Sequence, residues 1–327
     1  MTGVVYNNSN GTQPVGALTQ VNYGSGDFDN FSYDPQTGRM TGYQFNVGAS
    51  GQAVIGALTW NQNGTLQQLK ITDPFNSADQ QTCTYSYDDV ARISGANCGS
   101  IWAQDFSYDL FGNLTASGSS SWMPGYNSAS NHYTLAGTSY DADGNLLTDT
   151  FNTYSWNAEG KLISANGVGV TNDELGRMVE LGNTSGPVQF LYAPGGQQPV
   201  AETKGQNLVN AYVPLPGGGF AIYGSSGLAQ YNHADWLGSA RVISTPGRTV
   251  STDMAMHPMA RAMRAVVGCS SPVRGMSGRC QTRKDAAWMI FCIAGIARYR
   301  VAGFRPTRQG WRRWTRPTRK AGTDTPT

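Results

Sequence analysis

The chain has 327 residues, of which 41 are glycine, and only 13% of the residues are charged. This composition suits a turn-rich extracellular or shell-forming β protein better than a cytosolic enzyme. The length is sufficient for one large all-β unit or for two ordinary domains. Residues 1–6 show no basic region followed by an apolar run, so we expect no targeting segment there. The chain begins directly in strand-and-turn sequence, as a piece of a longer polypeptide would.

A short motif recurs seven times between residues 33 and 178: an aromatic residue, Asp or Asn, two residues, Gly, one residue, and Leu or Met. The copies occupy residues 33–40, 60–66, 87–93, 108–114, 140–146, 156–162 and 172–178. The first copy has one extra residue, the third has Ala91 in place of Gly, and the last begins with Asn172. Such repetition indicates an array of one structural unit.

Each copy predicts a strand, a tight turn and a second strand. Phe106 and Tyr108 alternate along a strand, and Asp109 can bond its own backbone to start a turn. Gly112 tolerates a positive φ there, and Leu114 begins the return strand. One hairpin cannot bury its aromatic face alone, but stacked neighbours can. The predicted fold is therefore all-β, an antiparallel hairpin array that coils or closes on itself.

A second pattern follows the repeats. Residues 212–218 read Tyr-Val-Pro-Leu-Pro-Gly-Gly, and residues 231–241 read Tyr-Asn-His-Ala-Asp-Trp-Leu-Gly-Ser-Ala-Arg. Together with the repeats, this string resembles the YD-repeat proteins of the rearrangement-hotspot (RHS) type. The resemblance implies a hollow β-shell that, in bacteria, encloses a variable C-terminal toxin or is displayed at the cell surface. Full members are far longer, so the resemblance also implies a fragment of such a shell, secreted or at the cell surface.

The charge distribution predicts where this design ends. Residues 1–254 carry a net charge of −11, whereas residues 255–327 carry +13. We therefore expect a YD-repeat hairpin array over residues 1–180, an RHS core-like β segment over residues 181–255, and an aberrant Arg-rich tail over residues 256–327.

Three interpretations of the tail stay open: a basic segment that binds nucleic acid, a C-terminal effector, and sequence translated out of frame from near residue 255. The third is favoured because residues 256–261 and 309–319 keep the family's spacing without its residues. It predicts that residues 258–327 are largely disordered, with one short helix over residues 286–297. Related shells cut their toxin free with acids in an Asp-Pro-x-Gly segment. Residues 315–322 stand at that place without acids, so self-cleavage is not expected.

The search for catalytic and metal-binding residues is negative. The three histidines are His132, His233 and His257, and no zinc-protease or phosphate-loop motif occurs. His233, Asp235 and Ser239 suggest a nucleophilic triad, but a turn displaces the serine, so a plain turn explains the string. Asp141 and Asp143 offer oxygens for Ca²⁺, yet the spacing of a calcium loop is absent and a turn is the better interpretation. No enzyme activity, cofactor or metal site is predicted.

Five cysteines occur in the chain: Cys83, Cys98, Cys269, Cys280 and Cys292. Cys83 and Cys98 flank the third repeat, on strands that a hairpin brings together. They form either a disulfide, if the protein meets an oxidising compartment, or two buried thiols. The other three lie in the tail and match no metal-site spacing.

The sequence therefore favours a non-enzymatic fragment of a bacterial RHS/YD-repeat shell that encapsulates or displays a C-terminal toxin. The expected partners are the rest of the shell or an effector, without a specific nucleic acid or a membrane span. One alternative is a carbohydrate- or surface-binding adhesin module that uses Trp60 and Trp156; the repeat aromatics equally suit plain packing. Another alternative is a basic tail that acts as a nucleic-acid-binding effector.

Overall fold

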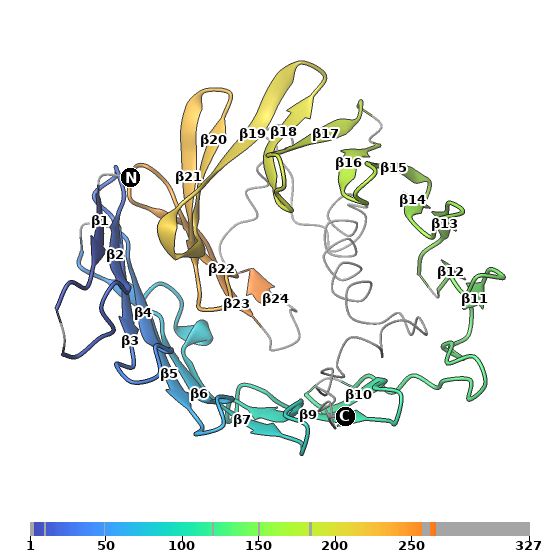
Figure 1. Ribbon diagram of the computed structural model, residues 1–327, viewed down its shortest axis with the longest axis horizontal. Coiled ribbons are helices and arrows are strands. Elements are labelled where there is room, and N and C mark those ends of the chain that lie inside the picture. Colours follow the sequence, from blue (N-terminus) through green and yellow to red (C-terminus); the bar gives the residue numbers. More distant parts are fainter. Residues whose placement is uncertain are drawn as a thin grey trace, which may run out of the picture. The chain divides into compact units, whose positions relative to one another are not determined.

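The chain forms antiparallel sheets in which strands follow one another in sequence order. The computed structural model describes residues 3–9, 11–48, 50–119, 121–149, 151–182, 185–256 and 262–265. Within these residues there is a sheet of ten strands, a pair of strands and a sheet of twelve strands, and no α-helix. Each strand pairs with the one before it and the one after it in its sheet (Figure 1). The all-β hairpin array predicted from the repeats is confirmed.

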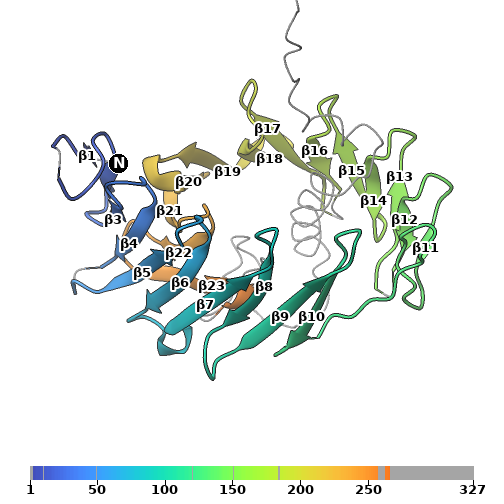
Figure 2. The ribbon, with the colours of Figure 1, turned by 60° about the horizontal axis from the view of Figure 1, so that its bottom comes forward.

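The first sheet consists of β1 (Gly3–Tyr6), β2 (Leu18–Asn22), β3 (Phe28–Tyr33), β4 (Met40–Asn46), β5 (Ala53–Trp60), β6 (Leu66–Thr72), β7 (Gln81–Tyr87), β8 (Ile93–Asn97), β9 (Ala103–Tyr108) and β10 (Leu114–Gly118). The pair consists of β11 (Ser139–Tyr140) and β12 (Leu146–Thr148). Figure 2 shows β5 to β10 lying side by side in chain order.

The second sheet consists of β13 (Tyr154–Trp156), β14 (Leu162–Ala165), β15 (Val168–Asn172), β16 (Met178–Leu181), β17 (Val188–Tyr192), β18 (Pro199–Lys204), β19 (Asn207–Pro214), β20 (Phe220–Gly224), β21 (Gly227–Ala234), β22 (Ala240–Ser244), β23 (Val250–Met256) and β24 (Ala262–Ala265). Two short 3-10 turns, η1 (Ser77–Asp79) and η2 (Pro216–Gly218), lie in the connections after β6 and β19.

One turn geometry closes most of the repeat hairpins. The Asp109 N–H donates to the Asn113 carbonyl at 3.1 Å, and the Gly112 N–H donates to the Asp109 carbonyl at 3.0 Å. Oδ1 of Asp109 accepts the N–H groups of Phe111 and Asn113, and Gly112 has a φ of 81°. This is a three-residue loop that ends in a left-handed residue. The same two backbone bonds close the turns at residues 61–65, 88–92, 141–145, 157–161, 173–177 and 235–239.

The turn at residues 88–92 departs from the others because Ala91 holds a φ of 62° where glycine is usual. A left-handed conformation costs a residue with a Cβ about 1–2 kcal/mol, whereas glycine adopts it without this cost. About 0.5–1 kcal/mol of the gain is offset, because glycine loses more conformational entropy on folding. Ala91→Gly is therefore expected to raise the free energy of unfolding by about 0.5–1 kcal/mol, measured by urea denaturation. The matched control, Gly112→Ala, is expected to lower it by a similar amount. A less stable Ala91→Gly protein would contradict this account.

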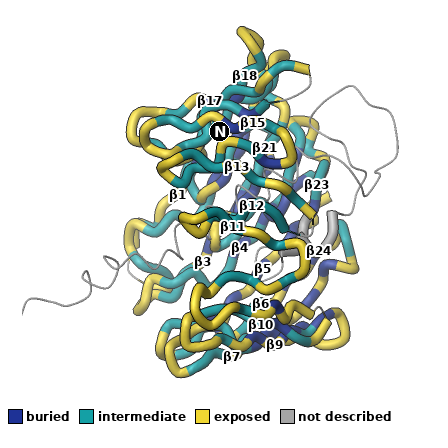
Figure 3. Tube along the Cα trace, turned by 90° about the vertical axis from the view of Figure 1, so that its right-hand side faces the viewer, coloured by how far each residue is buried: buried dark blue, intermediate teal, exposed yellow. Residues whose placement is uncertain are grey.

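The main hydrophobic core joins strands that are far apart in the sequence. It combines side chains of β2 to β6 with Leu215 and with side chains of β20 to β22, and Figure 1 shows these two groups of strands lying beside each other. Its buried members include Val21, Phe31, Tyr43, Phe45, Val54, Leu58, Leu215, Ala221, Tyr231 and Val242. A second, smaller cluster surrounds β7 to β10. Exposed residues gather at the hairpin tips (Figure 3).

Most predictions for the tail lie outside the described residues. This holds for the helix over residues 286–297, for Cys269, Cys280 and Cys292, for the segment at 315–322, and for disorder over residues 258–327 apart from β24. Residues Ala262–Ala265 form β24, which pairs with β23 in antiparallel register. No helix within the described ranges is long and apolar enough to cross a membrane.

Candidate functional site

Neighbouring repeats are joined by a recurring side-chain bond, which we call the aromatic stitch. In five repeats, the first residue donates a hydrogen bond to the carbonyl of the last residue of the repeat before it; the Tyr140 hydroxyl instead accepts the Tyr133 N–H at 3.0 Å. The stitches are Trp60 to Met40 at 2.7 Å, Tyr87 to Leu66 at 2.9 Å, Tyr108 to Ile93 at 3.0 Å, Trp156 to Leu146 at 2.7 Å and Asn172 to Leu162 at 2.8 Å. Tyr192, on the strand after the last repeat, donates to Met178 at 2.8 Å.

The stitch explains why the leading residue carries a donor. Tyr and Trp bury a ring and still present an O–H or N–H at its end, which Phe cannot do. Asn172 lacks a ring but keeps the donor, so the copy without an aromatic residue makes the same bond. The sequence predicted that the repeats pack against one another; it did not predict this bond. The donor shared by Tyr, Trp and Asn is the signal that could have revealed it.

Tyr108→Phe is expected to lower the free energy of unfolding by about 1 kcal/mol, because it leaves the Ile93 carbonyl without its donor and retains the ring. Urea denaturation measures the difference. Tyr6→Phe is the matched control, since the Tyr6 side chain is 54% exposed on the edge strand β1. Equal effects of the two substitutions would show that the stitch contributes nothing.

Buried polar contacts connect β3 and its flanking turns, together with the loop after β6, to β21, β22 and β23; we call these contacts the polar seam. Nδ1 of His233 lies 2.7 Å from Oδ1 of Asp29, and Nε2 of His233 lies 2.8 Å from Oγ of Ser244. The Tyr23 hydroxyl donates to Oδ2 of Asp29 at 2.5 Å. Burial raises the pKa of Tyr23 far above its usual range, and the Asp29 carboxylate adds to the rise. Tyr23 therefore stays a neutral donor.

The hydrogen-bond pattern of Asp29, His233 and Ser244 is that of a nucleophilic triad, but the three side chains are inaccessible to a substrate. His233 and Ser244 are fully buried and Asp29 is 2% exposed. The rings of Tyr23 and Phe45 lie 5.0 and 5.6 Å from the imidazole. A nucleophile needs a position beside it for the reacting atom, and here packed side chains surround it. The group acts as a structural link between β3 and the β21–β22 hairpin.

The triad considered in the sequence is not brought together. Oδ1 of Asp235 accepts the N–H groups of Leu237 and Ser239, so both residues belong to a repeat-like turn, as expected. His233 points instead to Asp29, which is 204 positions away in the chain. A signal was present: Asp29 shares a strand face with Phe31, and His233 shares one with Tyr231, so two-residue periodicity places both polar groups inward.

Arg241 lies at the centre of the second group of the polar seam. Its Nη2 donates to Oδ2 of Asp73 at 2.6 Å, its Nη1 makes a short bond to Oδ1 of Asp253, and Nη1 lies 4.0 Å from Oδ2 of Asp79. Arg241 is 2% exposed, and the three carboxyl groups are likewise buried. Sequence reasoning missed this cluster, because its members come from the loop after β6 and from two later strands.

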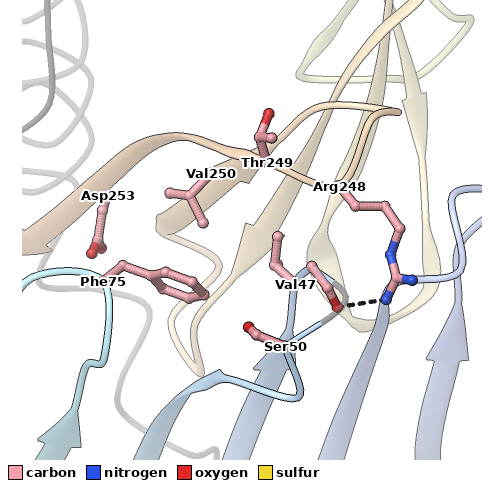
Figure 4. Close-up of a pocket in the computed structure, with 8 residues that line it drawn as sticks. Val47, Ser50, Phe75, Arg248, Thr249, Val250 and Asp253 are labelled. Carbon is pink, nitrogen blue, oxygen red and sulfur yellow. Dashed lines mark hydrogen bonds between the residues drawn. The ribbon is translucent and has the colours of Figure 1, made fainter.

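A third contact lies at the end of the β22–β23 hairpin. Nε of Arg248 donates to Oδ1 of Asp27 at 2.8 Å, and Nη2 donates to the Gly48 carbonyl at 2.6 Å. Beside it is a cavity of about 440 Å³, and its lining residues are Val47, Gly48, Ser50, Phe75, Arg248, Thr249, Val250 and Asp253. Figure 4 shows the Arg248 guanidinium hydrogen-bonded beside the cavity, with Phe75 and Asp253 on the opposite side.

The remaining candidate residues are occupied by structural contacts. Oδ1 of Asp141 accepts the N–H groups of Asp143 and Asn145, and Oδ2 accepts the Asn145 amide, so the turn interpretation is confirmed. The hydrogen bonds of Asp141 hold its pKa below the usual range. Cys83 and Cys98 are joined in a disulfide with Cα atoms 4.0 Å apart. Of the two outcomes open in the sequence, the structure has the disulfide.

Comparison with known proteins identifies related folds. Residues 22–203 match the family model described as Teneurin YD-shell. A crystal structure of TcdB2–TccC3 is similar with a TM-score of 0.59 and 14% identity, covering 79% of this chain and 16% of that one. The Photorhabdus luminescens Tc holotoxin pore is similar with a TM-score of 0.56 and 13% identity, covering 77% of this chain and 15% of that one. The chain thus spans about one sixth of their length. A comparison with curated proteins found no match.

Proposed function

Because the chain belongs to the teneurin YD-shell family, we propose that it is a wall segment of an RHS-type shell that encloses or displays a C-terminal effector polypeptide. The observation that carries this proposal is the uninterrupted sequence order of the strands in both large sheets, stitched from repeat to repeat. A ladder of this kind can be extended by further repeats at little structural cost. The similarity to TcdB2–TccC3 supports the shell architecture.

Exposed apolar residues at the turn tips support a polypeptide partner. The residue before the turn glycine, or before Ala91 in the third copy, is apolar and largely exposed in four turns: Val90, Phe111, Leu175 and Leu237. These turns each connect an odd-numbered strand to the next strand, so in an antiparallel ladder Val90 and Phe111 share one rim of the ten-stranded sheet, and Leu175 and Leu237 share one rim of the twelve-stranded sheet. Apolar side chains on one rim favour contact with another part of an assembly.

The division at residues 180 and 255 remains part of this proposal, as do the absence of enzymatic activity and a secreted or cell-surface location. The disulfide between Cys83 and Cys98 supports the location, because such bonds persist in oxidising compartments. Sugar binding by Trp60 and Trp156 is the weaker alternative, since both indole N–H groups are already donated to backbone carbonyls.

The test is protease protection of the native assembly. An antibody against β1 to β23 captures the assembly from source cells. The captured material is digested under native conditions, and mass spectrometry identifies the surviving peptides. An enclosed effector is expected to survive as long as the strands do. Denaturation before digestion is the control and should expose every segment.

Two results would distinguish failure of the proposed function from failure of the fold on which it depends. Loss of all other peptides while residues 3–256 survive would refute enclosure and leave the ladder intact. Rapid loss of the strands themselves would contradict the stable ladder on which the proposal depends.

A further inference from the structure

The cluster around Arg241 holds an imbalance of charge in a buried place. Asp73, Asp79 and Asp253 surround a single guanidinium, and all four side chains are almost completely buried. If every carboxyl group were ionised, two negative charges would remain without a counter-charge. Burying an uncompensated charge costs several kcal/mol, so a proton or a cation must reduce the imbalance.

The geometry favours a proton over a metal ion. The three carboxylates place oxygens within 4.8 Å of one another, which is a spacing that a cation could use. However, Oδ1 of Asp73 already accepts the N–H groups of Phe75 and Asn76, and its Oδ2 accepts Arg241. Oδ1 of Asp253 is also bonded to Arg241. Too few oxygens remain for the six to eight that Ca²⁺ requires, and the guanidinium already occupies the centre.

Asp253 is the carboxyl group of this cluster that we expect to hold the proton. Its Oδ2 is buried and meets no hydrogen-bond donor among the described residues. A proton on this carboxyl group turns it into a donor toward the neighbouring carboxylate of Asp73. We propose that Asp73, Asp79, Asp253 and Arg241 form a proton-operated lock that fastens the loop after β6 to the β22–β23 hairpin when Asp253 is protonated.

The ionisable groups around the lock agree with this assignment. Burial raises the pKa of Asp253 to about 7; Arg241 opposes the rise, whereas Asp73 and Asp79 add to it. Asp235 and Tyr43 also interact electrostatically with Arg241, and burial raises the pKa of both groups. The folded protein therefore keeps a proton that the unfolded chain, with the ordinary value of 3.8, has released. The stabilisation is fully present below pH 3.8 and is lost as the pH rises through about 7.

Hydrogen exchange on the full chain tests the lock. The readout is protection of the Phe75 and Asn76 amides, which donate to Asp73, after correction for the intrinsic exchange rate. Protection is expected to fall at least about tenfold between about pH 5 and about pH 8. Asp253→Asn, which keeps a donor and removes the titrating charge, is expected to retain protection at the higher pH. Asp89→Asn, on an exposed turn, is the matched control and should behave as the wild type does.

A second variant keeps the test decisive if Asp253→Asn does not fold. Asp79→Asn removes one neighbouring negative charge, so it is expected to shift the loss of protection to lower pH. Protection that does not change with pH in the wild type would overturn the proposal. The proposal would also be overturned if excess Ca²⁺ restored protection at about pH 8 in the wild type and had no effect on Asp253→Asn, since the cluster would then be a cation site.

Discussion

Arg241→Met is expected to lower the free energy of unfolding by about 3–5 kcal/mol, measured by urea denaturation at neutral pH. The substitution removes the one cation from among three buried carboxyl groups while it keeps most of the side-chain volume. Asp73 and Asp253 would each lose a hydrogen bond at the same time. The loss is expected to grow as the pH rises, because more of the carboxyl groups then ionise without a partner.

Arg248→Met is the control for this prediction. Arg248 is also an arginine of the polar seam with an aspartate partner, but its side chain is 35% exposed, so water compensates part of the loss. Its substitution should therefore cost clearly less. Equal losses in the free energy of unfolding for the two variants would contradict the larger cost that we assign to the buried Arg241 cluster.

Cys98→Ser is expected to lower the free energy of unfolding by about 3 kcal/mol, because the disulfide closes a loop across 15 positions of the chain. Both cysteines are almost completely buried among Ala96, Trp102 and Phe106. The substitution thus also places a hydroxyl or a lone thiol in an apolar cluster. Chemical denaturation with and without a reducing agent measures the contribution.

The double variant Cys83→Ser with Cys98→Ser separates the bond from the packing. Reductant should destabilise the wild type by most of the loss seen in Cys98→Ser and should leave the double variant unchanged. A wild type whose unfolding is insensitive to reductant would mean that the two thiols are not bonded in solution.

Local features of the fold were predictable from the sequence. The alternation of Phe106 and Tyr108 and the spacing from Asp109 to Gly112 fix a strand and a turn through contacts within a few residues. Cys83 and Cys98 were placed on paired strands for the same reason. Such short-range rules repeat along the chain, so one correct hairpin predicts the others.

The polar seam was not predictable in this way. Asp29 and His233 come from strands 204 positions apart, and nothing local says which distant strand will face which. Arg241 and its hydrogen-bond partner Asp73 are 168 positions apart in the chain. Two-residue periodicity can show that a charged side chain points inward, but its partner follows only from how the first sheet packs on the later hairpins. The family resemblance supplied the architecture without these pairs.

The order of the strands has a consequence for how the protein is made. Since each strand in a sheet pairs with its predecessor, a hairpin can form as soon as its second half leaves the ribosome, before the remainder is translated. The contacts of Asp29, Asp73 and Asp27 must wait until His233, Arg241 and Arg248 have been synthesised. The ten-stranded sheet can therefore assemble during translation, before the buried ion pairs that join it to β21–β23 exist.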